Sequence, residues 1–246
     1  MPITASTMAQ CHKSYPLITA VAFAGALASG FLLPLVAQGQ TAPSVTEVAQ
    51  FSPLHTAAYK GDLARLEKLI AAKADINTRD PHGRTAVHVA TFARQRDVIR
   101  ALAKAGANLE LLENDRYDAV TVASVADDDE TLKVLLSLGA SAKLTTSRYD
   151  GTALIAAAHL GHDGVVRQLI AAGAPLDHVN NLHWTAMIES IVLGNGGARH
   201  QEVLRALLVA KANAQLTDRM GTTPLALARS RGYSNMVAML EKAGAK

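Results

Sequence analysis

Apolar residues recur with a fixed period along most of this chain. Each follows, two places later, a Ser, Thr or Asp that can open a helix, and successive copies are 33, 33, 34, 33 and 38 residues apart. The apolar residues are Leu54, Val87, Val120, Leu154, Met187 and Leu225. A constant period of this size indicates one supersecondary unit stacked on itself. The pattern predicts one domain over 52–246, with units at about 52–79, 80–112, 113–146, 147–179, 180–217 and 218–246.

Polar and glycine positions predict two helices in every unit. An N-cap side chain that can accept a free backbone N–H precedes each first helix, at Ser52, Thr85, Asp118, Thr152, Thr185 and Thr223. Glycines that suit a left-handed residue end several first helices, at Gly61, Gly161, Gly194 and Gly232. Most second helices end in Gly-Ala, but Lys73 and Lys211 replace that glycine. If the backbone there is left-handed, each lysine costs roughly 1 kcal/mol relative to glycine.

The turns between units complete a recognisable motif. The fullest forms are Asp80-Pro81-His82-Gly83-Arg84-Thr85 and Asp218-Arg219-Met220-Gly221-Thr222-Thr223. The whole pattern, D-x-x-G-x-T-P-L-H-x-A-A-x-x-G-H…L-L-x-x-G-A, resembles the ankyrin repeat over about residues 47–246. This resemblance implies an all-α repeat solenoid of six stacked helix-turn-helix repeats, with short β-hairpin fingers and a concave binding face. It also implies that His55 and His88 bond the backbone of the turn.

Several segments depart from the motif. Unit five carries His183 in place of the finger glycine and inserts five residues around 195–199, which we expect to form a flexible surface loop. The acidic run 127–130 lacks the ligand spacing of a calcium loop, and we expect a solvated turn that caps the next helix. Arg229 and Glu241 in the last unit replace Ala58 and Ile70, as a wet outer face at the end of a stack requires.

The N-terminus predicts export. No charged residue lies between Lys13 and Glu47, and an apolar stretch fills 17–36 before small residues at 37–40. These features are typical of a signal peptide. We expect residues 1–39 to be that signal, with cleavage after Ala37 or Gly39, and 40–51 to be a linker and partial first finger. The predicted location is the periplasm. The alternative is an uncleaved anchor in the inner membrane that faces the periplasm, because about 20 apolar residues can span a bilayer.

Charge and composition argue against several functions. The formal net charge is +3, and the basic residues are interspersed with acids rather than gathered in the stripe expected of a nucleic-acid binder. The lone cysteine, Cys11, precedes the apolar stretch, so the mature chain needs no disulfide. We find no catalytic arrangement, metal triad or cofactor loop. His159 and His162 are three residues apart, but no third ligand follows. We therefore expect no cofactor and no enzymatic activity.

Aromatic residues are scarce, at 4% of the chain, yet most fall at the variable positions of fingers and first helices. In the ankyrin family these positions face the groove, and aromatic and arginine side chains are enriched at interface hot spots. The candidate partner-binding residues are Phe51, Tyr59, His82, Arg84, Phe92, Tyr117, Arg148, Tyr149, His159, Trp184 and Arg231. The alternative is that some of these rings pack across neighbouring fingers and stiffen the stack.

These features predict a non-enzymatic protein-protein interaction module that is exported to the periplasm. The expected partner is another protein, not nucleic acid, and the mature chain is expected to be a monomer without membrane contact. The chain also resembles two kinds of periplasmic ankyrin protein: accessories that protect against oxidative stress, and immunity proteins that neutralise a periplasmic toxin. The sequence leaves both roles open.

Overall fold

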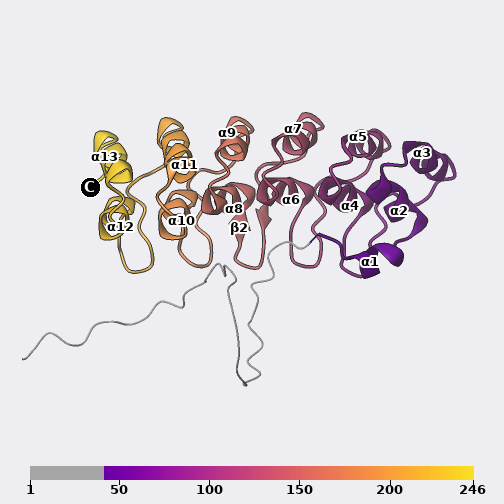
Figure 1. Cartoon of the computed structure of the whole chain (residues 1–246), viewed down its shortest axis with the longest axis horizontal. Coiled ribbons are helices and arrows are strands. Elements are labelled where there is room, and N and C mark those ends of the chain that lie inside the picture. Colours follow the sequence, from indigo (N-terminus) through magenta and orange to yellow (C-terminus); the bar gives the residue numbers. More distant parts are fainter. Residues whose placement is uncertain (1–41) are drawn as a thin grey trace, which may run out of the picture. The chain divides into compact units, whose positions relative to one another are not determined.

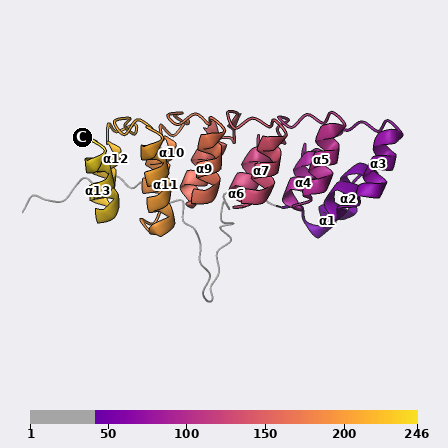
Figure 2. The ribbon, with the colours of Figure 1, turned by 90° about the horizontal axis from the view of Figure 1, so that it is seen from above.

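The computed structural model describes residues 42–246, so the predicted signal peptide and Cys11 lie outside the described residues. Within this part, six helix pairs stack side by side in two rows (Figure 1). The first helices are α2 (Pro53–Lys60), α4 (Ala86–Phe92), α6 (Ala119–Val125), α8 (Ala153–Leu160), α10 (Ala186–Val192) and α12 (Pro224–Ser230). The second helices are α3 (Leu63–Ala71), α5 (Arg96–Lys104), α7 (Asp129–Ser137), α9 (Asp163–Ala171), α11 (Ala198–Val209) and α13 (Ser234–Lys242). Figure 2 shows α3, α5, α7, α9, α11 and α13 lying in sequence order. The predicted solenoid of six repeats is confirmed.

One continuous apolar core holds the stack together, from Leu54 in the first repeat to Leu240 in the last. Helices of this length are unstable alone, so their stability comes from packing. The residue five places after each N-cap is always small and at most 1% exposed: Ala57, Ala90, Ala123, Ala157, Ser190 and Ala228. Small side chains at this position let successive first helices approach closely, and larger ones would force them apart.

All six predicted N-cap residues begin a first helix. Asp118, for example, accepts the Thr121 backbone N–H at 2.9 Å, and Ser52 accepts that of His55 at 3.4 Å. Thr85 differs in detail, because its hydroxyl contacts Nδ1 of His88 at 2.9 Å. These bonds satisfy backbone donors that a helix start leaves free.

The ends of the helices agree with the sequence in all but one place. Lys73 and Lys211 have φ of 59° and 70°, so both stand in the left-handed conformation that glycine normally takes. The prediction for Gly194 is wrong. Helix α10 ends at Val192, and the left-handed residue of this turn is Gly196, with φ of 67°. The insertion in this repeat moves the turn along the chain.

The fingers extend from the row of first helices (Figure 1). One contains paired strands, β1 (Thr145–Thr146) and β2 (Gly151–Thr152), which are antiparallel with Thr145 opposite Thr152. The other fingers are closed by backbone N–H groups that donate from Asp80 to Arg84, Glu113 to Tyr117, Asn180 to Trp184 and Asp218 to Thr222, at 2.9 to 3.1 Å. In each of them the carbonyl of the first residue also accepts a backbone N–H from within the turn.

Successive fingers are bonded to one another. The backbone N–H of Asn114 donates to the carbonyl of His82 at 3.0 Å. In the next two junctions, Ser147 donates to Arg116 and Asn181 donates to Tyr149, both at 2.9 Å. Backbone hydrogen bonds therefore join four consecutive fingers in one series.

The segment predicted as a linker contains a short helix, α1 (Val45–Ala49), in its described part. Its N-cap is Ser44, whose hydroxyl accepts the Glu47 backbone N–H at 3.3 Å while the Glu47 carboxylate accepts the Ser44 backbone N–H at 2.6 Å. This reciprocal capping box explains why so short a segment is helical.

The five inserted residues of repeat five form an ordered turn rather than the flexible loop that we expected. Gly197 caps α11, which is longer than the other second helices, and the Tyr233 hydroxyl donates to the Gly194 carbonyl at 2.9 Å. His200 is 9% exposed, and its Nε2 lies 2.9 Å from the carbonyl of His159. The residues that flank the insertion are thus bonded to repeats four and six.

The acidic run caps a helix as predicted, but it is less solvated than expected. Asp128 is the N-cap of α7 and accepts the Thr131 backbone N–H at 3.1 Å. It is only 5% exposed, because Arg96 of the preceding repeat covers it and donates to Oδ1 at 3.1 Å.

The last repeat has the polar outer face predicted for an end. Arg229 and Glu241 pair at 2.6 Å, and both side chains are exposed. No helix between residues 42 and 246 combines the length and apolar character needed to cross a bilayer.

Candidate functional site

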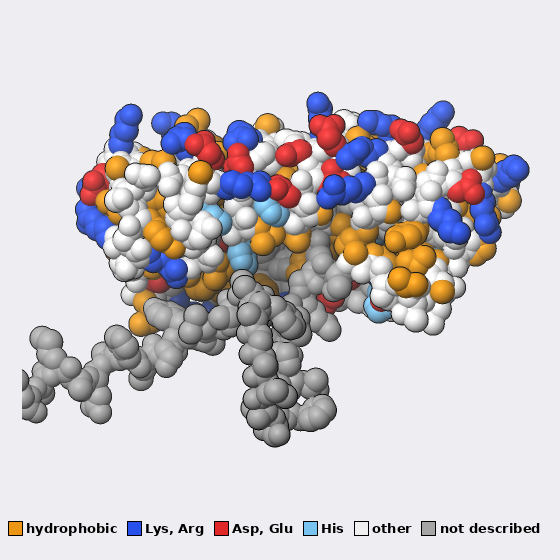
Figure 3. Space-filling view, viewed as in Figure 1, with side chains coloured by type: hydrophobic (Ala, Val, Ile, Leu, Met, Phe, Trp, Pro, Cys, Tyr) orange, Lys and Arg blue, Asp and Glu red, His pale blue; other side chains and the backbone are white. Residues whose placement is uncertain are grey.

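The two rows of helices present different surfaces. We call the six first helices together with the fingers the finger face, and the six second helices the outer row. In Figure 3 the outer row carries acidic and basic side chains of both signs along its upper edge. Hydrophobic side chains gather lower down, at the α2–α4 end, and histidines lie near α8 and α10. A mixed charged surface suits contact with solvent, whereas grouped apolar and aromatic side chains suit contact with a partner.

The candidate residues lie on the finger face but differ in exposure. Each belongs to a finger, to a first helix or to the turn at one of its ends. The exposed residues are His82, Arg148, Tyr149 and Arg231. The half-buried residues are Phe51, Tyr59, Phe92, Tyr117, His159 and Trp184. Tyr149 at the tip of the fourth finger is 44% exposed, and it is the most exposed aromatic residue in the described part.

We expected Arg84 to be available to a partner, but this residue is only 5% exposed. Its Nε donates to Oδ2 of Asp80 at 2.7 Å, and its guanidinium lies 5.7 Å from the centre of the Phe51 ring. Phe51 in turn packs edge-to-face against Tyr59, with ring centres 6.0 Å apart. At this end of the stack two rings pack on one another within the first repeat, and Arg84 of the second finger packs on one of them.

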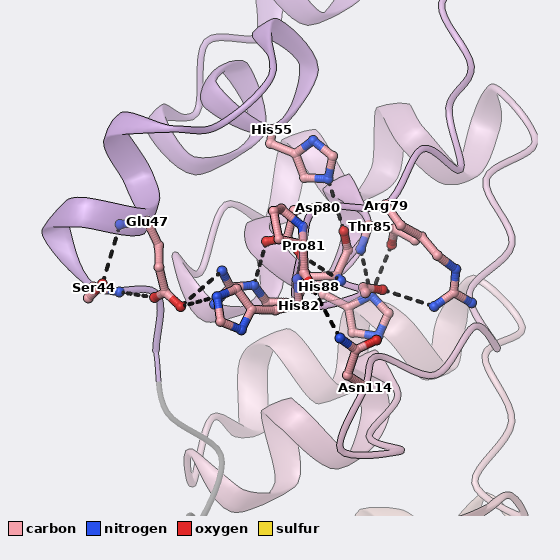
Figure 4. Close-up of polar contacts among 12 residues, drawn as sticks. Ser44, Glu47, His55, Arg79, Asp80, Pro81, His82, Thr85, His88 and Asn114 are labelled. Atoms are coloured by element: carbon pink, nitrogen blue, oxygen red, sulfur yellow. Dashed lines mark hydrogen bonds and ion pairs between the residues drawn. The ribbon is translucent and has the colours of Figure 1, made fainter.

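Helix α1 lies against the second finger (Figure 4). Its Glu47 carboxylate is 2.6 Å from Nε2 of His82, and the same oxygen is 3.6 Å from Nη2 of Arg84. The backbone hydrogen bond from Ser44, with help from the Arg84 and His82 charges, lowers the pKa of Glu47 despite partial burial. Two candidate residues thus present nitrogen atoms to a carboxylate that belongs to this chain itself.

His55 and His88 have the structural role that the resemblance implied (Figure 4). His88 accepts the Thr85 backbone N–H at Nδ1, at 3.1 Å, and its Nε2 lies 3.1 Å from the carbonyl of Tyr117 in the next repeat. In the same way, Nε2 of His55 lies 2.9 Å from the carbonyl of Arg84 in the next repeat. Burial lowers the pKa of His88 to about 4, so its ring is neutral at physiological pH.

Repeat five brings together a polar group that the sequence analysis missed. Glu189 on α10 is 5% exposed, and the side-chain amide of Asn180 donates to its Oε1 at 2.8 Å. Its other oxygen lies 3.5 Å from Nδ1 of His159, one of the candidate residues. Burial raises the pKa of Glu189 to about 7, and burial together with the positive fields of His200 and His162 lowers the pKa of His159.

A signal for this group was present in the sequence. The position four places after the N-cap holds Thr56, Val89, Val122, Ala156 and Leu227 in the other repeats. Only repeat five has a carboxylic acid there, and the same repeat has Asn180 where the turns of repeats two and six have Asp80 and Asp218. An aspartate at 180 would put two carboxylates side by side, so the two departures compensate each other.

The arrangement suits binding. Among residues 42–246, no three His, Cys, Asp or Glu side chains converge as a metal site requires. Nδ1 of His162 lies 2.9 Å from the Ser124 carbonyl, so this side chain links two repeats. The finger face offers rings, histidines and charged groups spread over several repeats, which is typical of a surface that recognises another protein.

Comparison with known proteins agrees with this description. The family model for ankyrin repeats in three copies matches residues 17–113, 54–146 and 119–214. The chain belongs to the ankyrin repeat family. The ankyrin repeat protein YahD of Escherichia coli (strain K12) is 33% identical over 190 residues, which cover 77% of this chain and 94% of YahD.

Solved structures share the fold. An ankyrin repeat domain from Acinetobacter baumannii is 43% identical, with a TM-score of 0.75, and the match covers 79% of this chain and 98% of that domain. A chain from a complex of a Bdellovibrio bacteriovorus predatory endopeptidase with its immunity protein matches with a TM-score of 0.65. At 23% identity, over 78% of this chain and 98% of the other, this second match concerns the fold alone. Ankyrin repeats act as protein-protein interaction modules, and this chain is built as one.

Proposed function

We propose that this protein is a non-enzymatic binding module that holds a partner protein against its finger face in the bacterial periplasm. The supporting observation is the difference between its two surfaces. Most aromatic and histidine side chains lie on the fingers and first helices. The outer row carries interspersed charges (Figure 3). A stack of six repeats presents this face as one extended surface, and such surfaces bind proteins through large contact area.

Photo-crosslinking tests the face directly. A photoreactive amino acid is placed at Tyr149, which is exposed on a finger, or at Val209, which is 74% exposed on α11 in the outer row. Both variants are expressed in the native bacterium and irradiated. The proposal expects a specific crosslinked protein from position 149 and none from position 209. Equal crosslinking from both positions would refute a role for the finger face.

A pull-down from periplasmic extract measures the contribution of the rings. The double variant Tyr117→Ala/Trp184→Ala should recover at least tenfold less of the crosslinked partner than the wild type, since buried aromatic anchors dominate interface energies. Because both rings are half-buried, circular dichroism must show that the variant is folded. Val209→Ala is the matched control and should recover as much partner as the wild type.

The compartment is a separate element of the proposal, and it rests on the sequence of the first 39 residues. Mass spectrometry of the N-terminus tests it. A mature start near Gln38 or Gln40 indicates a cleaved, exported protein. An intact apolar stretch in the membrane fraction indicates the anchored form instead.

Two specific roles are compatible with periplasmic binding. Neutralisation of a toxin is suggested by the fold shared with a chain of the endopeptidase–immunity protein complex. Protection against oxidative stress rests on the sequence resemblance. Deletion of the gene distinguishes them, because an immunity protein is required for survival of cells that produce the toxin, whereas a stress accessory is required only under peroxide.

A further inference from the structure

Helix α1 is held to the rest of the protein by few contacts. None of its residues is buried, and Val45 is 88% exposed. Five residues of helix are far too short to be stable alone. Among the described residues, the polar contacts between α1 and the second finger come from one side chain, Glu47 (Figure 4). A segment with little buried surface and few contacts separates at low cost.

The surface beneath Glu47 is more firmly built. Arg84 is 5% exposed, is fixed by Asp80 at 2.7 Å and is covered by the Phe51 ring. Among the described residues, its Nη2 has no hydrogen-bond partner although it is buried. An unsatisfied buried donor on a charged group costs free energy. His82, whose side chain is 53% exposed, provides a second nitrogen at the same place.

Glu47 fills this place incompletely. Its carboxylate meets His82 at 2.6 Å but remains 3.6 Å from Nη2 of Arg84, which is beyond hydrogen-bond distance. The capping box explains the shortfall, because Oε2 of Glu47 also accepts the Ser44 backbone N–H at 2.6 Å. A carboxylate that does not also accept the Ser44 N–H can approach Nη2 of Arg84 more closely and accept a hydrogen bond from it.

We propose that Arg84 and His82 form a carboxylate-binding site on the finger face, which Glu47 occupies in the free protein and an acidic side chain of the partner occupies in the complex. This inference rests on the proposed function and adds to it one chemical property of the partner. Helix α1 then acts as a removable cover over the N-terminal end of the face. If α1 serves only to cover the first repeat, neither a free carboxylate nor a partner's acid will replace it.

The first experiment removes the Glu47 carboxylate from the site. In the Glu47→Ala variant of the whole protein, NMR follows the ring signals of His82 and the side-chain N–H signal of Arg84 while acetate replaces chloride at constant ionic strength. Both signals should move saturably, with an apparent affinity about tenfold or more above that of the wild type, where Glu47 competes at high effective concentration. The control Glu67→Ala removes an exposed acid from α3 and should behave as the wild type. Equal responses in Glu47→Ala and wild type, or none, overturn the proposal.

The second experiment releases α1 without disturbing its capping box. His82→Ala removes the 2.6 Å contact but leaves Ser44 and Glu47 intact. Hydrogen exchange at Val48 and Gln50, whose N–H groups bond within this segment, should be faster by about fivefold or more than in the wild type. His183→Ala on another finger is the control and should leave it unchanged. If the exchange rate is unchanged in His82→Ala, Glu47 does not hold α1 in place through His82. That result overturns the proposal that α1 is a removable cover.

The third experiment uses the partner protein that the crosslinking and pull-down experiments recover. Glu47→Ala should bind it several-fold more tightly than the wild type, since no internal carboxylate has to be displaced. Equal or weaker binding overturns the competition between Glu47 and the partner. The acetate and exchange results are independent of the proposed function, whose failure is seen as crosslinking from Val209 as well as Tyr149. The acetate and exchange measurements need no partner.

Discussion

The side-chain amide of Asn180 donates a 2.8 Å hydrogen bond to Oε1 of the buried Glu189. Asn180 also holds its own finger, because its Oδ1 accepts the backbone N–H groups of Leu182 and Trp184, each at 3.0 Å. One side chain therefore connects the conformation of the fifth finger to a carboxylic acid on α10. Since burial raises the pKa of Glu189 to about 7, this connection is sensitive to pH near neutrality.

Glu189→Gln should remove a pH-dependent loss of stability. The folded protein holds the proton of Glu189 up to about pH 7, whereas an unfolded glutamate releases it near 4.5. Folding therefore takes up a proton between these values, and the free energy of unfolding falls as pH rises through this window, by about 3 kcal/mol at most. Urea denaturation at pH 4.5 and pH 8 should show this fall in the wild type relative to Glu189→Gln. Glu67→Gln is the control, and a parallel response of all three proteins would contradict the prediction.

His88→Gln should destabilise the protein by about 2 kcal/mol, because it disturbs a buried hydrogen bond to the Thr85 N–H and a part-buried one to the Tyr117 carbonyl. In the wild type, the His88 ring loses its proton when the protein folds near pH 6, because burial lowers its pKa. Its pKa is about 4 in the folded state against 6.5 normally. The stability that His88 provides is complete above pH 6.5 and is lost as pH falls towards 4. NMR titration of the ring checks the pKa, and a midpoint near 6.5 in the folded protein would disprove this account. His183→Gln, on an exposed fingertip, is the matched control for stability.

Lys73→Gly and Lys211→Gly should each stabilise the protein by roughly 1 kcal/mol, because both lysines have positive φ and glycine adopts this conformation without strain. The control is Lys68→Gly inside α3, where glycine should cost about 1 kcal/mol instead. Thermal unfolding of the three variants should give shifts of opposite sign. A loss of stability in Lys73→Gly would show that its side chain makes a contact that outweighs the strain.

Arg199→Ala should cost about 0.5–1 kcal/mol, and the loss should shrink in high salt. Its guanidinium bridges three repeats, since it pairs with Asp127 at 2.7 Å and with Asp163 at 3.1 Å. The side chain is 53% exposed, so solvent weakens both pairs. Arg205→Ala on the same helix, with only a local partner in Glu202, is the control. Denaturation at low and high salt measures the difference.

Local features of the fold could be predicted because they depend on neighbouring residues. An N-cap needs only a side-chain oxygen and the N–H groups beside it, and all six N-caps were located correctly. The left-handed conformation of Lys73 and Lys211 followed from their place in the repeat.

Other features depend on contacts between distant residues. The burial of Arg84 results from Phe51 and Glu47, and neither lies in the same repeat. The order of the inserted segment results from bonds such as that between His200 and the His159 carbonyl. Asn180 and Glu189 are two departures from the repeat pattern, but their contact depends on the position of the fifth finger over α10.

The series of backbone bonds between fingers has a consequence for recognition. Because Asn114, Ser147 and Asn181 each bond one finger to the one before it, backbone hydrogen bonds set the interval between these neighbouring fingertips. A ligand that meets two fingertips must carry its own contacts at the same interval. One residue inserted between those contacts would put them out of step with the protein, whatever their individual strength.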